Sequence, residues 1–232
     1  MPFAHKRFDV GSVKIELDPA QLSWPRPGEA NSESTLGGNR QYQDLRLYDW
    51  EEVRRVLDAE QGMIQRIEAA DNVEETMSEI QEEREAEWEE CDGDPIHGLD
   101  IGVAGAVIAL SAARCVPFTS CNGGAFDGGH LERHPLIAFY MRPQLAPIFI
   151  EAAKSAGAGL ESSGSVMLYA DEITAIVRFA EQLYARRAEI DAIPLPRDRS
   201  GDDVDWTDYE EGEDGNDKDG GSSNDPDQGE LF

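Results

Sequence analysis

The sequence predicts an α+β fold: a small two-layer sheet-and-helix domain, with an N-terminal acidic helical arm and a disordered acidic tail. Two observations predict it. Between residues 97 and 192 the patterns follow the order helix, strand, strand, helix, strand, helix. The acidic charge lies outside this block, because residues 48–98 carry a net −14 and residues 197–232 a net −11 of the total −28.

Composition divides the chain into four regions. Residues 1–47 form an N-terminal extension with one expected strand, SVKIEL at 12–17, in which apolar and polar side chains alternate. Residues 48–96 form the acidic amphipathic arm, residues 97–192 the α+β core domain, and residues 193–232 the tail. The tail has too little apolar surface to offset the entropy lost on ordering, so we expect it to be disordered.

The arm is predicted to be a long helix that begins at Asp49, whose carboxylate can accept from the first amides of the helix. Apolar residues recur along it at three- and four-residue steps: Trp50, Val53, Leu57, Ile64, Ile67, Ala70, Val73, Met77 and Ile80. Gly62 and the pair Asp71–Asn72 are the points where the helix would bend or divide. We expect its glutamate-rich face to be solvated. Its apolar stripe would pack on the core domain or on another subunit, and the imperfect heptads favour the core domain.

Each element of the core domain has its own signal. DIGVAGAVIALSAARC, from Asp100, predicts a buried helix of small residues, and VPFTSC predicts a short strand. PLIAFYM, from Pro135 to Met141, predicts an apolar strand at the centre of the sheet. RPQLAPIFIEAAKSAG predicts a helix ended by Gly157, and GSVMLYA a third strand. Asp171 is the expected cap of the last helix.

The composition limits the partners and the compartment. A chain with a net charge of −28 repels nucleic-acid phosphate, so direct binding to DNA or RNA is not expected. MPFAHKRFDV does not resemble a signal peptide, and no apolar run has the length of a membrane span, so no membrane association is expected. Three cysteines, an odd and low number, favour a cytoplasmic protein with reduced thiols.

The segment CVPFTSCNGGAFDGGHLERHP, residues 115–135, holds the residue types of a metal site. If HLERH forms one helical turn, His130 and His134 share a face as two zinc ligands would. Cys121 would be the third ligand and water the fourth, as in a catalytic zinc site. In a structural zinc site the fourth ligand would instead be Asp127, Cys115 or His97. The spacing lacks the paired Cys-x2-Cys of secure zinc motifs, so zinc is one alternative among three.

The second alternative makes Cys121 a catalytic nucleophile. The loop amides from Asn122 to Gly124 would hold an anion. A nearby histidine, oriented by Glu132 or Asp127, would deprotonate the thiol.

The third alternative is structural. Cys115 would be a core residue, because a free cysteine buries like a small apolar side chain. The four glycines of the segment would supply positive φ angles in a long hairpin: Gly123, Gly124, Gly128 and Gly129. His130 and His134 would then be ordinary surface residues.

A helix, a strand that ends in TSCNG, a loop with histidine and an apolar strand resemble a segment of known proteins. The pattern is similar to the Ser-Cys-x-Gly segment of the wybutosine-synthesising tRNA methyltransferase-like proteins, and to small bacterial and phage domains with a Ser-Cys-x-Gly-His loop. It covers residues 100–140 and rests on Thr119, Ser120, Cys121 and Gly123. Gly124 stands where that loop has its histidine, and the basic surface of a tRNA enzyme is missing, so methyl transfer is not carried over to this chain.

The last five residues of the sequence, QGELF, form a separate motif. They resemble the Gln-x-x-Leu-Phe pentapeptide by which bacterial polymerases and repair proteins dock on the sliding clamp. Gln228 would form hydrogen bonds, and Leu231 and Phe232 would enter a hydrophobic pocket. Gly229 stands in place of the usual aliphatic second residue.

The leading functional hypothesis is a cytosolic accessory protein of bacterial or phage type, tethered to the replication sliding clamp by its tail. One alternative is a zinc- or thiol-dependent enzyme that uses Cys121 with His130 or His134. The other is an acidic protein that imitates nucleic acid and inhibits a basic protein.

Overall fold

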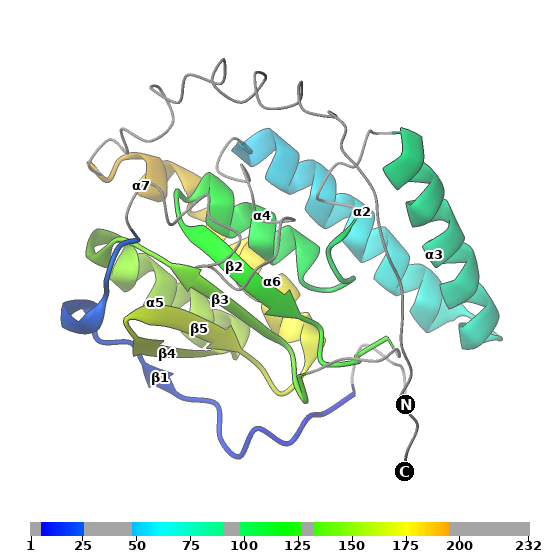
Figure 1. The fold of residues 1–232 in the computed structure, drawn as a ribbon, viewed down its shortest axis with the longest axis horizontal. Coiled ribbons are helices and arrows are strands. Elements are labelled where there is room, and N and C mark those ends of the chain that lie inside the picture. Colours follow the sequence, from blue (N-terminus) through cyan, green and yellow to red (C-terminus); the bar gives the residue numbers. More distant parts are fainter. Residues whose placement is uncertain (1–5, 26–47, 91–97, 127–131, 195–232) are drawn as a thin grey trace, which may run out of the picture. The chain divides into compact units, whose positions relative to one another are not determined.

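The computed structural model describes residues 6–25, 48–90, 98–126 and 132–194. They form a five-stranded mixed sheet with helices packed on one face and further helices beyond that layer (Figure 1). This is the α+β fold that the sequence predicts. The predicted tail from residue 195 onward, with the QGELF motif, lies outside the described residues.

The strands run in an order that differs from their order in the chain. They are β1 (Ile15–Glu16), β2 (Val116–Cys121), β3 (Leu136–Tyr140), β4 (Gly159–Ser163) and β5 (Ser165–Tyr169). The sheet order is β1-β4-β5-β3-β2, in which β1 is parallel to β4 and all other neighbours are antiparallel. The apolar strand β3 is paired on both sides, as its sequence predicts.

Strand β4 of the sheet was not predicted from the sequence. Its sequence, GLESS, contains no β-branched or aromatic residue, so its strand signal is weak. It pairs along its whole length with β5 through a tight turn at Gly164, whose φ of 81° favours glycine. Tertiary pairing, and not local preference, makes this segment a strand.

The helices occupy the segments between the strands and before them. They are α2 (Trp50–Ala69), α3 (Val73–Glu90), α4 (Ala104–Ala112), α5 (Ala146–Ala156), α6 (Ile173–Ala185) and α7 (Arg187–Asp191), with short 3-10 turns η2 (Pro19–Gln21) and η6 (Pro143–Leu145). Gly157 ends α5 with a φ of 76°, as predicted. The helix expected from Asp100 begins only at Ala104, because Gly102 adopts a φ of 91° in the preceding turn.

The acidic arm begins and divides where the sequence predicts. The Asp49 carboxylate accepts hydrogen bonds from the amides of Glu51 and Glu52 at 2.8 and 3.0 Å. The arm divides into α2 and α3 at Asp71–Asn72. The prediction that the helix would bend or divide at Gly62 was wrong, because α2 continues through this residue. The apolar stripe of α2 packs on α4 and α6, and α3 packs on α2.

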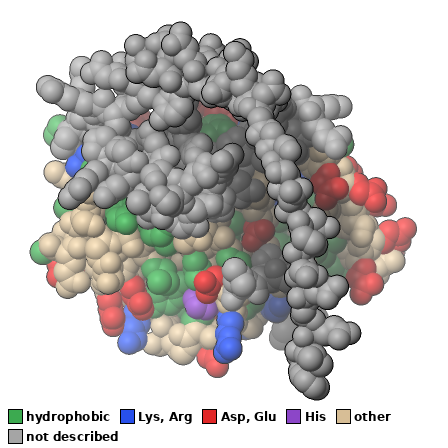
Figure 2. Space-filling model, viewed as in Figure 1, with side chains coloured by type: hydrophobic (Ala, Val, Ile, Leu, Met, Phe, Trp, Pro, Cys, Tyr) green, Lys and Arg blue, Asp and Glu red, His purple; other side chains and the backbone are tan. Residues whose placement is uncertain are grey.

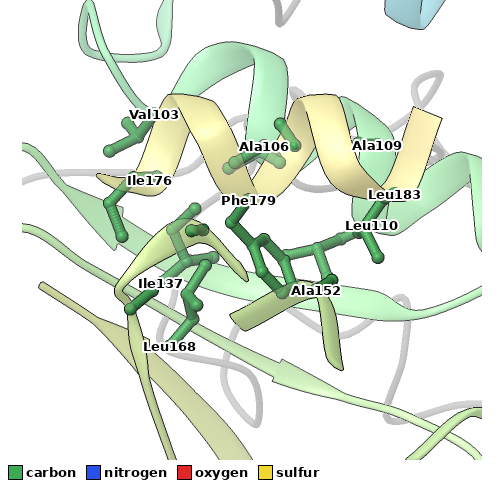
Figure 3. Close-up of a cluster of buried hydrophobic side chains, with 14 of the residues drawn as sticks. Val103, Ala106, Ala109, Leu110, Ile137, Ala152, Leu168, Ile176, Phe179 and Leu183 are labelled. Carbon is green, nitrogen blue, oxygen red and sulfur yellow. The ribbon is translucent and has the colours of Figure 1, made fainter. Parts of the chain in front are cut away.

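The main core lies between the sheet and the helices that cover it. Figure 3 shows Ile137 and Leu168, from β3 and β5, beside Phe179 of α6. Ala106 and other small side chains of α4 lie on the far side of α6. All of these residues are completely buried. The small side chains of α4 let neighbouring helices approach closely, which accounts for its unusual composition.

Asp171 does not cap the last helix, and that prediction was wrong. The N-cap of α6 is Glu172, which makes no capping hydrogen bond through its side chain. Asp171 instead accepts from the Arg7 guanidinium at 2.5 Å, and its backbone carbonyl accepts from Phe8 at 2.7 Å. The carboxylate therefore holds the N-terminal segment against the start of α6. None of the described helices combines the length and apolarity needed to cross a membrane.

Candidate functional site

Cys121 is the last residue of β2 and lies opposite Leu136 of β3. Leu136 in turn pairs with Tyr169 of β5. The side chains of Cys121, Leu136 and Tyr169 lie on the face of the sheet opposite to the one that carries the buried Ile137 and Leu168. We call this the outer face. Cys121 is only 8% exposed there, and its Sγ accepts a hydrogen bond from the amide of Gly123 at 3.3 Å.

Burial raises the pKa of the Cys121 thiol, and the nearby charges of Asp100 and Glu132 raise it further. Hydrogen bonds from the amides of Gly123 and Glu132 oppose this shift without reversing it. The thiol is therefore held in its protonated form at neutral pH. A nucleophilic cysteine requires the opposite, a thiolate stabilised by nearby positive charge.

The glycine loop after Cys121 uses its amides within the protein. The Asn122 amide donates to Oδ2 of Asp100 at 3.1 Å, and the Gly124 amide donates to Oδ1 of Asn122 at 2.9 Å. With the Gly123 amide on the Cys121 sulfur, all three amides of the expected anion nest are occupied. The loop as described is a closed turn, and an anion would have to displace these contacts.

Glycine is required in this turn for two reasons. Gly123 and Gly124 have φ angles of 65° and 72°, as the hairpin interpretation predicts. A Cβ on Gly123 would also come within 2.4 Å of the His134 backbone. The turn therefore packs directly on the start of β3. Gly128 and Gly129 lie outside the described residues.

Of the two histidines in residues 115–135, the structure describes His134. The His134 backbone contacts Gly123, and its half-buried ring packs edge-on against Tyr169, with ring centroids 6.1 Å apart. His130 lies outside the described residues, as do Asp127 and His97, so the predicted set of Cys121, His130 and His134 stays a prediction. Within the described residues, no group of three or more His, Cys, Asp or Glu side chains has the arrangement of a metal site.

Cys115 is a core residue, in agreement with the structural interpretation. Its side chain is completely buried, and burial raises the pKa of its thiol strongly. It follows α4 directly, where its amide donates to the carbonyl of Leu110 at 2.9 Å.

The sequence reasoning missed Glu60, a buried carboxylate that belongs to the acidic arm. Glu60 is 3% exposed and points into the N-terminus of α4. Its Oε1 accepts from the amides of Gly102 and Ala104 at 2.7 and 3.0 Å, and its Oε2 accepts from Gly105 at 3.3 Å. Because α4 has no side-chain cap of its own, a residue of α2 satisfies its first amides.

The electrostatics around Glu60 involve a second charged residue. Burial raises the pKa of Glu60 to about 7, while the three amides and the positive charge of Arg84 act in the opposite direction. Burial lowers the pKa of Arg84, which donates to the carbonyl of Leu99. Asp100, one residue later, holds the amide of Asn122, so this polar cluster reaches from α2 and α3 to the Cys121 loop.

A signal for Glu60 was present in the sequence. It follows Leu57 by three residues and precedes Ile64 by four, so it lies within the apolar stripe of α2. A charged residue in such a stripe needs a buried partner, and the glycine-containing segment IGVAG at the start of the next apolar helix offers amides that no side chain of the segment caps.

The protein was compared with family models, with curated proteins and with solved structures, and none of them matches this chain.

Proposed function

We propose that this protein is a cytosolic accessory protein of bacterial or phage type that docks on the replication sliding clamp. The docking residues are Gln228, Leu231 and Phe232. The observation that carries the proposal is the QGELF motif itself, an apolar pair with a hydrogen-bonding residue in a strongly acidic segment.

The geometry of the Cys121 loop disfavours the alternative of a thiol-dependent enzyme. The Cys121 thiol has a raised pKa, and the amides beside it already bind Asp100, Asn122 and the sulfur. This arrangement stabilises a turn and offers no activated nucleophile.

The test is capture of a purified bacterial sliding clamp by the full chain. Deletion of residues 228–232 should abolish capture, because it removes both apolar anchors. Deletion of residues 219–223, DGGSS, is the matched control and should leave capture unchanged, since it removes five residues and no anchor. Capture that survives the terminal deletion would refute the proposal.

A zinc enzyme is the second candidate, because Asp100 and Glu132 add negative charge beside Cys121. A thiol next to carboxylates is a suitable start for a zinc ligand set, to which His130 and His134 would contribute. Metal analysis of the purified protein tests it. The zinc proposal expects about one zinc per chain, lost in Cys121→Ser. Protein without stoichiometric metal would eliminate it.

A further inference from the structure

The outer face of the sheet carries an exposed apolar residue at an unusual place. Met167 lies in β5, which is paired on both sides by β3 and β4, yet its side chain is 40% exposed. The uncovered face of an antiparallel sheet usually carries polar side chains, whereas the opposite face of β5 buries Val166 and Leu168. An exposed methionine is typical of surfaces that bind other proteins, because its flexible side chain adapts to different contacts.

Met167 forms part of a groove between the N-terminal segment and the sheet, with a volume of about 420 Å³. We call it the β5 groove. Its lining residues are Val10, Gly11, Ser12, Lys14, His134, Glu161, Met167 and Tyr169. On the same side of the molecule, Figure 2 shows hydrophobic side chains next to a histidine, with acidic and basic side chains around them.

The polar groups of the β5 groove are held in fixed positions. The Tyr169 hydroxyl donates to Oε1 of Glu161 at 2.8 Å and accepts from the Lys14 amide at 3.2 Å. These bonds orient the Glu161 carboxylate. Its second oxygen, Oε2, makes no hydrogen bond or ion pair with any residue that the structure describes. The Lys14 ammonium lies 3.4 Å from Glu16, which offsets its charge.

We propose that the β5 groove binds a basic peptide segment of a partner protein, one with a single large apolar side chain between cationic residues. Met167 and Val10 contact the apolar side chain, and Glu161 accepts from a cationic neighbour. Because Glu16 offsets Lys14, Glu161 leaves the β5 groove with one uncompensated negative charge, which favours a cationic side chain of the partner. This site is separate from Gln228–Phe232, so either proposal can fail alone.

The experiment measures binding of fluorescein-labelled peptides to the full chain by anisotropy at 150 mM salt, which screens weak charge attraction. The main probe is Arg-Lys-Phe-Lys-Arg. One comparison peptide replaces Phe with Ser, and the other, Glu-Asp-Phe-Asp-Glu, reverses the charges. Two variants alter the groove: Met167→Ser removes apolar contact, and Glu161→Gln removes the charge while keeping an acceptor for Tyr169.

Two matched variants control for effects outside the groove. Val13→Ser removes another exposed apolar side chain, 36% exposed, that does not line the groove. Glu74→Gln removes one exposed carboxylate from α3. We expect Met167→Ser and Glu161→Gln each to weaken binding of the Phe peptide by about tenfold, and the two controls to change it by less than about twofold.

Other results would overturn the proposal. Equal binding of the Phe and Ser peptides would mean that net charge alone attracts them. Binding that Glu74→Gln weakens as much as Glu161→Gln would also contradict a defined site, and so would the absence of binding. Circular dichroism of each variant establishes that a loss of binding does not come from unfolding.

Discussion

Glu60 joins separate parts of the fold through one carboxylate. It extends from α2 and accepts from three amides at the start of α4, and Arg84 of α3 lies near enough to affect its charge. Removal of a buried acceptor that serves several donors typically costs about 1–3 kcal/mol per unsatisfied group. A single residue of the acidic arm therefore contributes to the stability of the core helix.

The raised pKa of Glu60 predicts that the free energy of unfolding depends on pH. Its pKa is raised from 4.5 to about 7, so between these values the folded protein keeps a proton that the unfolded chain has lost. The free energy of unfolding therefore falls as pH rises through this window, by about 3 kcal/mol in total, and levels off above it. Urea unfolding of the wild type and of Glu60→Gln from pH 4.5 to 8 measures the difference.

The variant serves as its own control, because glutamine has the same shape and does not titrate in this range. All other titrating groups contribute equally to both proteins, so the wild type should lose stability relative to Glu60→Gln as pH rises. A difference that stays constant or grows with pH would show that the amides and Arg84 keep Glu60 ionised throughout.

The buried thiol of Cys121 should react slowly with alkylating reagents. Because burial raises its pKa and its side chain is only 8% exposed, iodoacetamide should modify Cys121 in the native protein more slowly than free cysteine, by about tenfold or more at pH 7.5. Peptide mapping by mass spectrometry separates it from the other cysteines, and urea-unfolded protein is the control. Modification faster than that of free cysteine would support an activated nucleophile.

The crossing of α2 and α4 depends on a glycine. A Cβ on Gly105 would lie 2.5 Å from Cδ2 of Leu57 and 2.8 Å from Oε2 of Glu60. Gly105→Ala should therefore push the two helices apart and reduce the free energy of unfolding by about 1–3 kcal/mol. Gly62→Ala, in the middle of α2, meets no atom within 4 Å and should raise stability by about 0.5–1 kcal/mol.

Thermal or urea unfolding of both variants checks this pair of predictions. The two substitutions add the same methyl group to helical glycines, so helix propensity alone would stabilise both proteins. Opposite effects show that close packing at Gly105 outweighs helix propensity. A stable Gly105→Ala protein would contradict the close crossing.

Elements with strong local signals could be predicted from the sequence. The apolar stripe and Asp49 mark α2, and the continuous apolar run marks β3 as an interior strand. β4 could not be predicted, because GLESS becomes a strand only by pairing with β5 and β1. Glu60 was missed for a similar reason, since its partners lie more than 40 residues away in the chain.

The candidate site was predictable only as a set of residues. The sequence indicated Cys121 as the residue to examine, but its chemistry depends on Asp100, Gly123 and Glu132, which surround the thiol in three dimensions. Burial raises the pKa of the thiol most, the two carboxylates add to this shift and the amides oppose it, and the sequence alone does not reveal this environment. The β5 groove was not predicted, because its walls come from residues 10–14 and from strands β4 and β5.

At the scale of the whole molecule, the acidic arm is integrated with the sheet-and-helix core. Residues of α2 belong to the same buried cluster as the strands. Arg54 binds Glu181 of α6 through two hydrogen bonds of 3.0 and 3.2 Å, and Arg66 binds Glu83 of α3 through two more. These pairs leave many other carboxylates of α2 and α3 exposed.

The affinity of the QGELF segment for a purified bacterial sliding clamp measures the proposed docking directly. Calorimetry should give micromolar binding, on the order of −8 kcal/mol, for the full chain. The same measurement on a synthetic peptide of residues 223–232 should give a similar value, and Leu231→Ala with Phe232→Ala should weaken both by about tenfold or more. A full chain that does not bind the clamp, or binds equally well without Leu231 and Phe232, would contradict the account.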